Sequence, residues 1–373
     1  MKEPAIDSAR GPLRDGPERA SADPLRARPP RRLTATTITL AHGSGGKAMR
    51  DLIADVFVQA FDDPELSRME DQARIDLTAL GAHGSRLAFT TDSYVVDPLF
   101  FPGGDIGSLA VCGTVNDLAV GGAVPLYLTC AMIIEEGFSV ELLRRIVQSM
   151  KATAREAGVR IVTGDTKVVP RGSADKVFIN TAGVGVIPEG IEVGAGRALP
   201  GDKIVINGHI GDHGAAIALA RGQFALESTI RTDCQPLYGL VRAMLDVCPE
   251  IRALRDATRG GVAAVLSEFA EASDVGLLID EAAIPVRPEV RALCELLGLD
   301  PIYLANEGKV VAIVPDKNAG ALLARMRSHP AGADSAIVGE VVVEPKRRVV
   351  AKTVFGGERV VDLLFGEQLP RIC

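Results

Sequence analysis

The sequence ends on a cysteine, Cys373, within the segment 369–373. The last residue of a chain is joined to one neighbouring residue only, so it is less restrained than the others. A thiol placed there can enter a pocket, accept a chemical group and carry it elsewhere. Pro370 disfavours a helical Leu369 and has no N–H to donate, so this segment is expected to leave the folded body extended. The pattern predicts a mobile thiol carrier, with a cysteine that ends the chain by chance as the alternative.

A glycine-rich segment precedes the first expected helix, and it consists of His42, Gly43, Ser44, Gly45, Gly46 and Lys47. Backbone N–H groups beside glycine, the start of a helix and a lysine together suit a polyphosphate. The segment is not a Walker A loop, because the G-x-x-x-x-G-K-[ST] spacing is absent. A flexible turn without a ligand is the alternative.

Four aspartates stand at the ends of apolar segments, namely Asp92, Asp117, Asp165 and Asp256. Carboxylates spread over several elements suit Mg²⁺ that is bound through substrate phosphates. Helix caps and Asx turns explain any single aspartate equally well. Near two of these acids lie further candidate nucleotide contacts, which are Thr166, Thr258, Arg259 and Gly260.

Lys167 and Glu307 each follow an expected strand or polar turn, with a glycine close by. A carboxylate and a lysine in a closed pocket can transfer protons once burial has shifted their pKa values. An ion pair at the surface is the alternative. The two residues are therefore a candidate proton-transfer pair.

Composition excludes several classes of function. The 373 residues carry a net charge of −7, without tryptophan and with four tyrosines, which disfavours nucleic acid and anionic membranes as partners. The six cysteines contain no C-x-x-C pair and the five histidines have no metal-binding spacing, which disfavours a zinc site. No secretory signal is recognised, so we expect free thiols in the cytoplasm.

Strands and helices are expected to alternate along the chain, which predicts an α/β or α+β protein. The hydrophobic patterns predict strands at 36–40, 87–96, 126–134, 161–167, 176–187, 203–207, 275–279, 310–314 and 336–343, and a hairpin at 348–361. Helices are expected after 47 and after 105, and at 139–157, 215–220, 237–245, 261–272, 288–297 and 319–327, with Asp105 and Ser139 as the caps of the second and third. The glycine-rich stretch 190–201 is the expected domain boundary.

Several of these stretches, taken in order, resemble the HypE family of hydrogenase expression/formation proteins, in the PurM-like superfamily of proteins related to aminoimidazole ribonucleotide synthetase. The similarity covers about residues 36–373. It rests on H-G-S-G-G-K (42–47), T-T-D-S-Y-V-V-D-P (90–98), G-T-V-N-D-L-A-V-G-G-A (113–123), G-D-T-K-V (164–168), D-A-T-R-G-G (256–261), N-E-G-K (306–309) and P-R-I-C (370–373). Each motif is weak alone, but the ordered set is specific.

The resemblance implies a two-domain PurM-like fold. Residues 1–33 are expected to be a disordered extension outside the similarity. Residues 34–190 would bind ATP and form a β-barrel with a second copy, which implies a homodimer. Residues 200–345 would be the C-terminal α/β sandwich, and 346–373 a hairpin and a mobile tail.

The resemblance also implies an activity, the ATP-dependent dehydration of a carbamoyl group on the Cys373 thiol to a thiocyanate. That product would supply cyanide for the iron of [NiFe]-hydrogenase. The implied partners are a HypF-type carbamoyltransferase and the HypC–HypD complex, and the implied cofactors are ATP and Mg²⁺. Glu307 would remove protons, Lys167 would position it or stabilise charge, and Asn116 would orient the carbamoyl group or a phosphate.

Three other functions stay open on the sequence. Selenophosphate synthetase and thiamine-monophosphate kinase also use ATP, but the former needs a reactive cysteine or selenocysteine in the glycine-rich loop, and neither explains Cys373. The third is a thiol carrier or scaffold that catalyses nothing. Such a carrier would need no ATP site.

Overall fold

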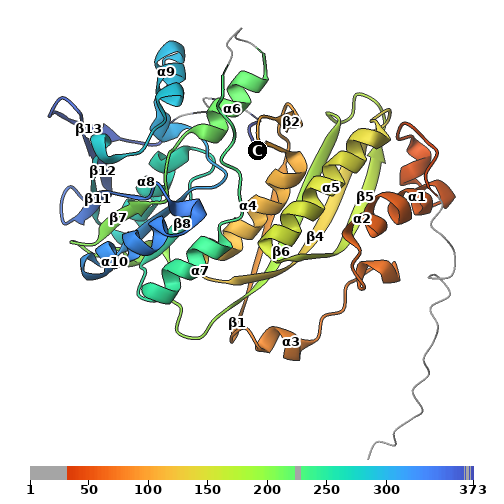
Figure 1. Cartoon of the computed structure of the whole chain (residues 1–373), viewed down its shortest axis with the longest axis horizontal. Coiled ribbons are helices and arrows are strands. Elements are labelled where there is room, and N and C mark those ends of the chain that lie inside the picture. Colours follow the sequence, from red (N-terminus) through yellow and green to blue (C-terminus); the bar gives the residue numbers. More distant parts are fainter. Residues whose placement is uncertain (1–31, 223–227, 365, 367–368, 370) are drawn as a thin grey trace, which may run out of the picture.

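The computed structural model describes residues 32–222, 228–364, 366, 369 and 371–373. Nearly all of the expected disordered extension, residues 1–31, lies outside the described residues, as does Pro370. Figure 1 shows two sheets with their helices, placed next to one another, and the C-terminal end of the chain between them.

The first sheet has four strands in the order β1-β6-β4-β5, formed by β1 (Arg86–Tyr94), β4 (Val124–Glu135), β5 (Arg160–Val169) and β6 (Val177–Ile187). β4 runs parallel to β5 and antiparallel to β6, and β1 is antiparallel to β6. A two-stranded ribbon of β2 (Phe100–Phe101) and β3 (Gly104–Asp105) follows β1. The sequence predicted all four large strands.

Two capped helices cover one face of this sheet (Figure 1). The Asp105 side chain accepts hydrogen bonds from the N–H groups of Gly107 and Ser108 at the start of α4 (Ile106–Val120). Ser139 caps α5 (Val140–Ala157). Both caps were predicted, because short polar side chains satisfy the N–H groups that open a helix.

The second sheet has seven strands in the order β13-β12-β9-β11-β7-β10-β8. Its strands are β7 (Lys203–Ile206), β8 (Ala253–Asp256), β9 (Gly276–Asp280), β10 (Val310–Val314), β11 (Ala336–Val342), β12 (Arg348–Lys352) and β13 (Glu358–Val361). The pair β9–β12 is parallel and the other pairs are antiparallel. β12 and β13 form the predicted hairpin, whose turn is closed by Thr353 and Gly357.

Both faces of the second sheet are covered. Ile204 and Ile206 of β7 pack into the cluster with α8 (Gly261–Ser273), whereas Val205 packs into the cluster with α7 (Tyr238–Val247) and α10 (Asp316–Arg327). A strand that is buried on both faces carries an unbroken apolar run, which explains the sequence of β10. The remaining helices of this half are α6 (Asp212–Ala220) and α9 (Pro288–Leu297).

The N-terminal part is helical where helix was predicted. α1 (Lys47–Leu52) and α2 (Gln59–Phe61) are joined by a π-helical segment, Ile53–Val58, and α3 (Leu77–Gly81) follows. The strand expected at 36–40 is wrong, since only Thr37 forms a β-bridge, with Ser139. Pairing there stops after one residue because Leu40 begins a 3-10 turn, Leu40–Gly43.

α4 joins the two halves. It is buried along nearly its whole length and contacts β1 and β6 of the first sheet as well as α7 and β8 of the second. A helix that packs on all sides is apolar all round, as this one is. Residues at the ends of β1, α4 and β8 are therefore brought together between the sheets.

Candidate active site

Three of the four predicted aspartates converge between the sheets. Asp92 lies on β1, Asp117 on α4 and Asp256 at the end of β8. Burial raises the pKa of Asp117, and the charge of Asp92 adds to the rise, while a 2.8 Å hydrogen bond from Thr90 Oγ1 opposes it. Burial and the charge of Asp117 raise the pKa of Asp256 to about 7. The three carboxyl groups thus repel one another, as expected where a cation is to bind.

Within one copy of the chain, Asp165 does not lie in this cluster. The prediction that four aspartates form one magnesium site is corrected to three for a single copy. The strand pairing aligns Asp92 with Thr181, Cys130 and Gly164, so these residues share one face of the sheet. Asp165 is the next residue on β5 and projects from the opposite face, because side chains alternate along a strand.

Glu307 is buried between the same elements, with 3% of its surface exposed. Burial raises its pKa well above the usual value, and the negative charges of Cys234 and Asp256 raise it further. Its Oε1 atom has no hydrogen-bond partner among the described residues. A buried carboxyl group with a raised pKa holds its proton more tightly, so it is a stronger base once it has lost that proton.

A buried ion pair holds the backbone of Glu307. The Asp233 carboxylate accepts hydrogen bonds from the N–H groups of Glu307 (3.1 Å) and Gly308 (3.2 Å), and its Oδ2 lies 2.9 Å from Lys309 Nζ. Burial alone would raise the pKa of Asp233, but Lys309 and the other partners outweigh it, so the pKa is lowered. Asp233 and Lys309 were not predicted as site residues, although Lys309 belongs to the N-E-G-K motif.

Within one copy of the chain, Lys167 and Glu307 lie in different parts of the structure. The prediction that they form a pair in one pocket is therefore wrong for a single copy. Its side chain is 65% exposed and its Nζ lies 3.2 Å from Asp165. It projects from the same face of β5 as Asp165, two residues away. The lysine nearest to Glu307 along the chain is Lys309, and its Nζ pairs with Asp233, whose carboxylate accepts from the Glu307 N–H.

Asn116 is buried on α4, and its amide is engaged with backbone groups. Its Nδ2 donates to the carbonyls of Gln235 (3.1 Å) and Glu307 (3.3 Å), and its Oδ1 accepts from Leu237 N–H (2.7 Å). These bonds tie α4 to the segments beside Glu307. In this structure Asn116 therefore positions the site, and its contact with a carbamoyl group or phosphate stays a prediction.

The glycine-rich loop 42–47 packs along β5, at the sheet edge opposite to β1. The His42 ring is buried and its Nδ1 accepts from the N–H (3.0 Å) and hydroxyl (2.9 Å) of Thr39. A Cβ atom on Gly43 would lie 2.7 Å from the Val168 nitrogen, so glycine is required there. Lys47 is exposed and pairs with Asp51.

The remaining candidates of the loop share that location. Ser44 donates from its hydroxyl to the Ala41 carbonyl (3.0 Å), and Gly45 has a φ of +78° beside Gly46. Thr166 is buried on the helix-covered side of β5 and borders a small cavity with Phe57. None of these lies on the elements that carry the aspartate cluster, so one copy of the chain does not bring the predicted phosphate loop and the acids together.

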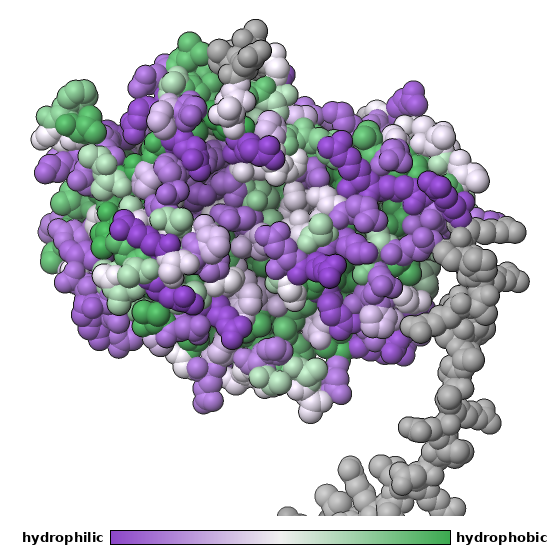
Figure 2. Space-filling model, in the orientation of Figure 1, coloured by the Kyte–Doolittle hydropathy of each residue, from purple (hydrophilic) through white to green (hydrophobic). Residues whose placement is uncertain are grey.

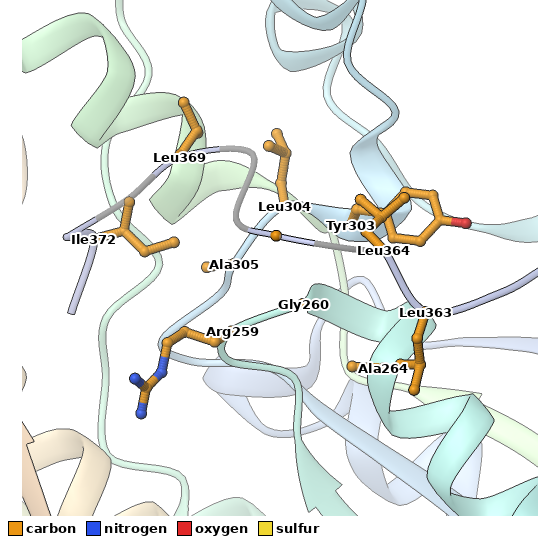
Figure 3. Close-up of a pocket in the computed structure, with 11 residues that line it drawn as sticks. Arg259, Gly260, Ala264, Tyr303, Leu304, Ala305, Leu363, Leu364, Leu369 and Ile372 are labelled. Atoms are coloured by element: carbon orange, nitrogen blue, oxygen red, sulfur yellow. The ribbon is translucent and has the colours of Figure 1, made fainter.

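The turn after β8 borders a cavity that the C-terminal segment helps to close. Arg259 and Gly260, which follow Thr258, line this cavity of about 120 Å³ together with Leu369 and Ile372 (Figure 3). A Cβ on Gly261 would lie 2.5 Å from the Ile302 carbonyl oxygen, and its φ is +63°. Only glycine fits this approach of α8 to the 302–304 backbone.

The C-terminal segment is docked between the two halves. The N–H groups of Val95 and Asp97, which follow β1, donate to the carbonyls of Cys373 (3.2 Å) and Arg371 (3.3 Å). The Ile372 side chain is buried, and Cys373 packs against the core of the first half. The segment thus adds a short strand-like stretch to the chain just beyond Asp92.

Side chains from both halves also hold the segment. Arg371 forms an ion pair of 2.6 Å with Asp175, and Arg221 donates to the Arg371 carbonyl (2.9 Å). His213 Nε2 lies 2.7 Å from the Ile372 carbonyl. No pattern in the sequence indicated these partners.

Two features are absent from the described residues. Within the described ranges, no helix is long and apolar enough to span a membrane. Over the same residues, no three His, Cys, Asp or Glu side chains already stand in a geometry that would hold a metal ion. On the face shown in Figure 2, hydrophilic side chains are interspersed with smaller hydrophobic areas.

Comparison with known proteins identifies the family. The model of the AIR synthase related protein N-terminal domain matches residues 69–187, and that of the C-terminal domain matches 200–352. Carbamoyl dehydratase HypE of Rhodobacter capsulatus is 60% identical over 336 residues, covering 90% of this chain and 98% of the relative. The Escherichia coli K12 protein of that name is 54% identical, covering 90% of this chain and 99% of its own length.

Solved structures agree with that assignment. A hydrogenase maturation protein HypE in complex with ATP has a TM-score of 0.86 at 48% identity, and covers 90% of this chain and all of its own. A HypE from a HypE–HypF complex has a TM-score of 0.73 at 47% identity, with 86% of this chain covered and all of its own. A thiamine-monophosphate kinase from Aquifex aeolicus, at 20% identity and a TM-score of 0.55 over 73% of this chain and 89% of its own, shares the fold alone. The chain is a carbamoyl dehydratase of the HypE family, with the α/β fold of the AIR synthase related, or PurM-like, proteins.

Proposed function

We propose that the chain uses ATP to dehydrate an S-carbamoyl group on Cys373 to a thiocyanate, in the maturation of [NiFe]-hydrogenase. The observation that carries this proposal is the docked C-terminal segment, whose Cys373 backbone is bonded to Val95, just beyond Asp92. The ATP complex of a relative that is 48% identical supports the use of ATP.

The reaction removes the elements of water from R–S–C(=O)–NH₂. The γ-phosphoryl group of ATP is transferred to the carbamoyl oxygen, and that oxygen leaves as part of inorganic phosphate, with ADP as the other product. Two protons leave the nitrogen as the C≡N bond forms, and Cys373 Sγ stays bonded to carbon throughout. The proposed base is Glu307, whose burial and neighbouring charges raise its proton affinity.

The acidic cluster suits the Mg²⁺ that accompanies ATP. The charge of Asp92 contributes to the raised pKa values of Asp117 and Asp256, so a divalent cation would relieve the repulsion among the three carboxyl groups. These three residues would hold the ion, and the ion would neutralise the phosphate charge during transfer. Arg259 at the neighbouring turn is a proposed contact to the nucleotide, with Thr258 and Gly260 beside it.

The remaining proposed contacts require a second copy of the chain, in accord with the expected homodimer. On the sheet face opposite α4 and α5, Phe89 is 71% exposed and Ile133 is 43% exposed. Asp165 and Lys167 project from that same face. A second copy packed there would cover the apolar side chains and would place Asp165, Lys167 and the 42–47 loop at an interface. Loss of the dimer in Phe89→Asp, measured by sedimentation, tests this arrangement.

The proposed partners are a HypF-type carbamoyl donor and a HypC–HypD acceptor of cyanide. A solved complex of HypE with HypF supports the first, since the HypE chain in it is 47% identical to this one. The buried thiols Cys112, Cys130, Cys248 and Cys294 lie outside any disulfide, which agrees with the proposed location in the reducing cytoplasm.

Mass spectrometry tests the proposal directly. After incubation with a HypF-type donor, carbamoyl phosphate and ATP, the peptide that contains Cys373 should carry a thiocyanate, whereas Cys373→Ala should carry no adduct. Cys248→Ala is the matched control, because its thiol lies in a core cluster that contains no residue of the tail, and this variant should still be modified. An adduct retained by Cys373→Ala would refute the role of the tail. A Cys373 adduct formed without ATP consumption would favour the non-catalytic carrier.

A further inference from the structure

His213 stands where the docked tail meets the backbone that holds Glu307. It lies in the first turn of α6, fully buried, and the edge of its ring meets Phe101 with centroids 5.6 Å apart and an interplanar angle of 88°. One ring nitrogen faces Ile372 and the other faces Thr232, at 2.7 Å each. The imidazole is therefore fixed in position and orientation.

The partners of His213 define which nitrogen carries the proton. The Ile372 carbonyl can only accept, so Nε2–H must donate to it. Burial lowers the pKa of His213, so the ring is neutral, and Nδ1 then accepts from the Thr232 hydroxyl. The tail thus accepts one hydrogen bond from Nε2–H, and the Thr232 hydroxyl at Nδ1 fixes the tautomer that makes this bond possible.

Thr232 leads from His213 to the site. Its N–H donates to the Pro102 carbonyl (2.8 Å), and its hydroxyl oxygen accepts from Cys234 N–H (3.1 Å). Asp233, between these two residues, accepts from Glu307 N–H. The loop 232–234 therefore contacts His213 at one residue and Glu307 at the next.

We propose that His213 is a positioning residue for the dehydration. It fixes the position of the docked tail relative to the loop 232–234, which holds Glu307. Its Nε2–H fixes the Ile372 carbonyl, one peptide away from the thiol that carries the carbamoyl group. The assignment deepens the proposed function and rests on it for its catalytic consequence, whereas the docking itself is measured without ATP or carbamoyl donor.

Two substitutions separate the two sides of the ring. In His213→Asn the amide lies near the position of Nδ1, so it can bond Thr232 but cannot reach Ile372. In His213→Gln the amide reaches the position of Nε2 and can still donate to Ile372. Alkylation of Cys373 by N-ethylmaleimide, followed on its peptide by mass spectrometry, should be about tenfold faster in His213→Asn than in the natural protein. In His213→Gln it should stay within about twofold.

The outcomes discriminate clearly. Equal rates in His213→Asn and the natural protein overturn the proposal, as do equally fast rates in both variants with unchanged melting temperatures. Should either variant fail to fold, deletion of residues 371–373 leaves His213 in place, and hydrogen–deuterium exchange at its ring C2 must then accelerate; unchanged exchange overturns the proposal. If the labelling results hold but the natural protein forms no thiocyanate on Cys373 with the carbamoyl donor and ATP, the proposed function fails and the docking assignment stands.

Discussion

Replacement of Lys309 by Met tests how much the buried ion pair with Asp233 stabilises the folded chain. The Lys309 and Asp233 side chains are 7% and 4% exposed, and their charged atoms are 2.9 Å apart. At an effective dielectric constant of about 20, that attraction amounts to about 6 kcal/mol. Asp233 would keep its two backbone N–H donors, so we expect a net loss of about 3–5 kcal/mol in the free energy of unfolding.

The pH dependence gives a second signature. Asp233 has a lowered pKa in the folded chain because Lys309 outweighs burial. Without Lys309, burial dominates and the folded pKa rises above the unfolded one. A group with a raised folded pKa binds its proton more tightly in the native state, so the variant loses stability as the pH rises. The deficit relative to the natural protein should therefore be largest at neutral pH and shrink towards pH 4.

Urea unfolding at several pH values provides the assay, and Lys203→Met is the matched control. Lys203 also forms a 2.8 Å ion pair, with Glu340, but the two side chains are 26% and 45% exposed. Such a pair contributes about 1 kcal/mol or less. A loss in Lys309→Met no larger than in Lys203→Met, or a deficit that grows on acidification, would refute the reasoning.

Three further predictions concern the site and its glycines. Glu307→Gln should accept the carbamoyl group but lower the rate of thiocyanate formation at least about 100-fold, measured by mass spectrometry; a normal yield would remove it as the base. The pKa of Asp256 is raised from 3.8 to about 7, so the natural protein loses stability as the pH rises across that interval, and Asp256→Asn should give a flatter profile in urea unfolding; an unchanged slope would contradict the shift. Gly261→Ala meets the Ile302 carbonyl and should cost well over the roughly 1–2 kcal/mol expected for Gly298→Ala, which has a similar φ of +68° but nothing within 4 Å of its Cβ; equal losses in thermal unfolding would show that the contact relaxes.

Local patterns in the sequence were sufficient for most of the fold. The apolar runs of β4 and β10 and the caps Asp105 and Ser139 depend on neighbours within a few residues, so they were predicted correctly. β8 (Ala253–Asp256) was missed because its two apolar residues are followed directly by Arg255 and Asp256, which leaves neither an apolar run nor an alternation to recognise. Its pairing with β10 fixes the place of Asp256.

The structure brings together only some of the candidate site residues that the sequence indicated. Asp92, Asp117 and Asp256 were singled out as acids at element ends, and their convergence follows from α4 packing between the sheets. Asp165 looked equivalent, yet strand register places it on the other face. Register is set by pairing between distant segments, which no local pattern encodes.

The sequence by itself determined the family, through ordered motifs that end at Cys373, and with it the fold class and the chemistry. Only the tertiary structure decided which partners act on which residue: Lys309 pairs with Asp233, which holds the Glu307 backbone, and His213 meets the tail. Motifs record which side chains are present, whereas burial, charge and hydrogen-bond direction depend on contacts between residues that are far apart in the chain.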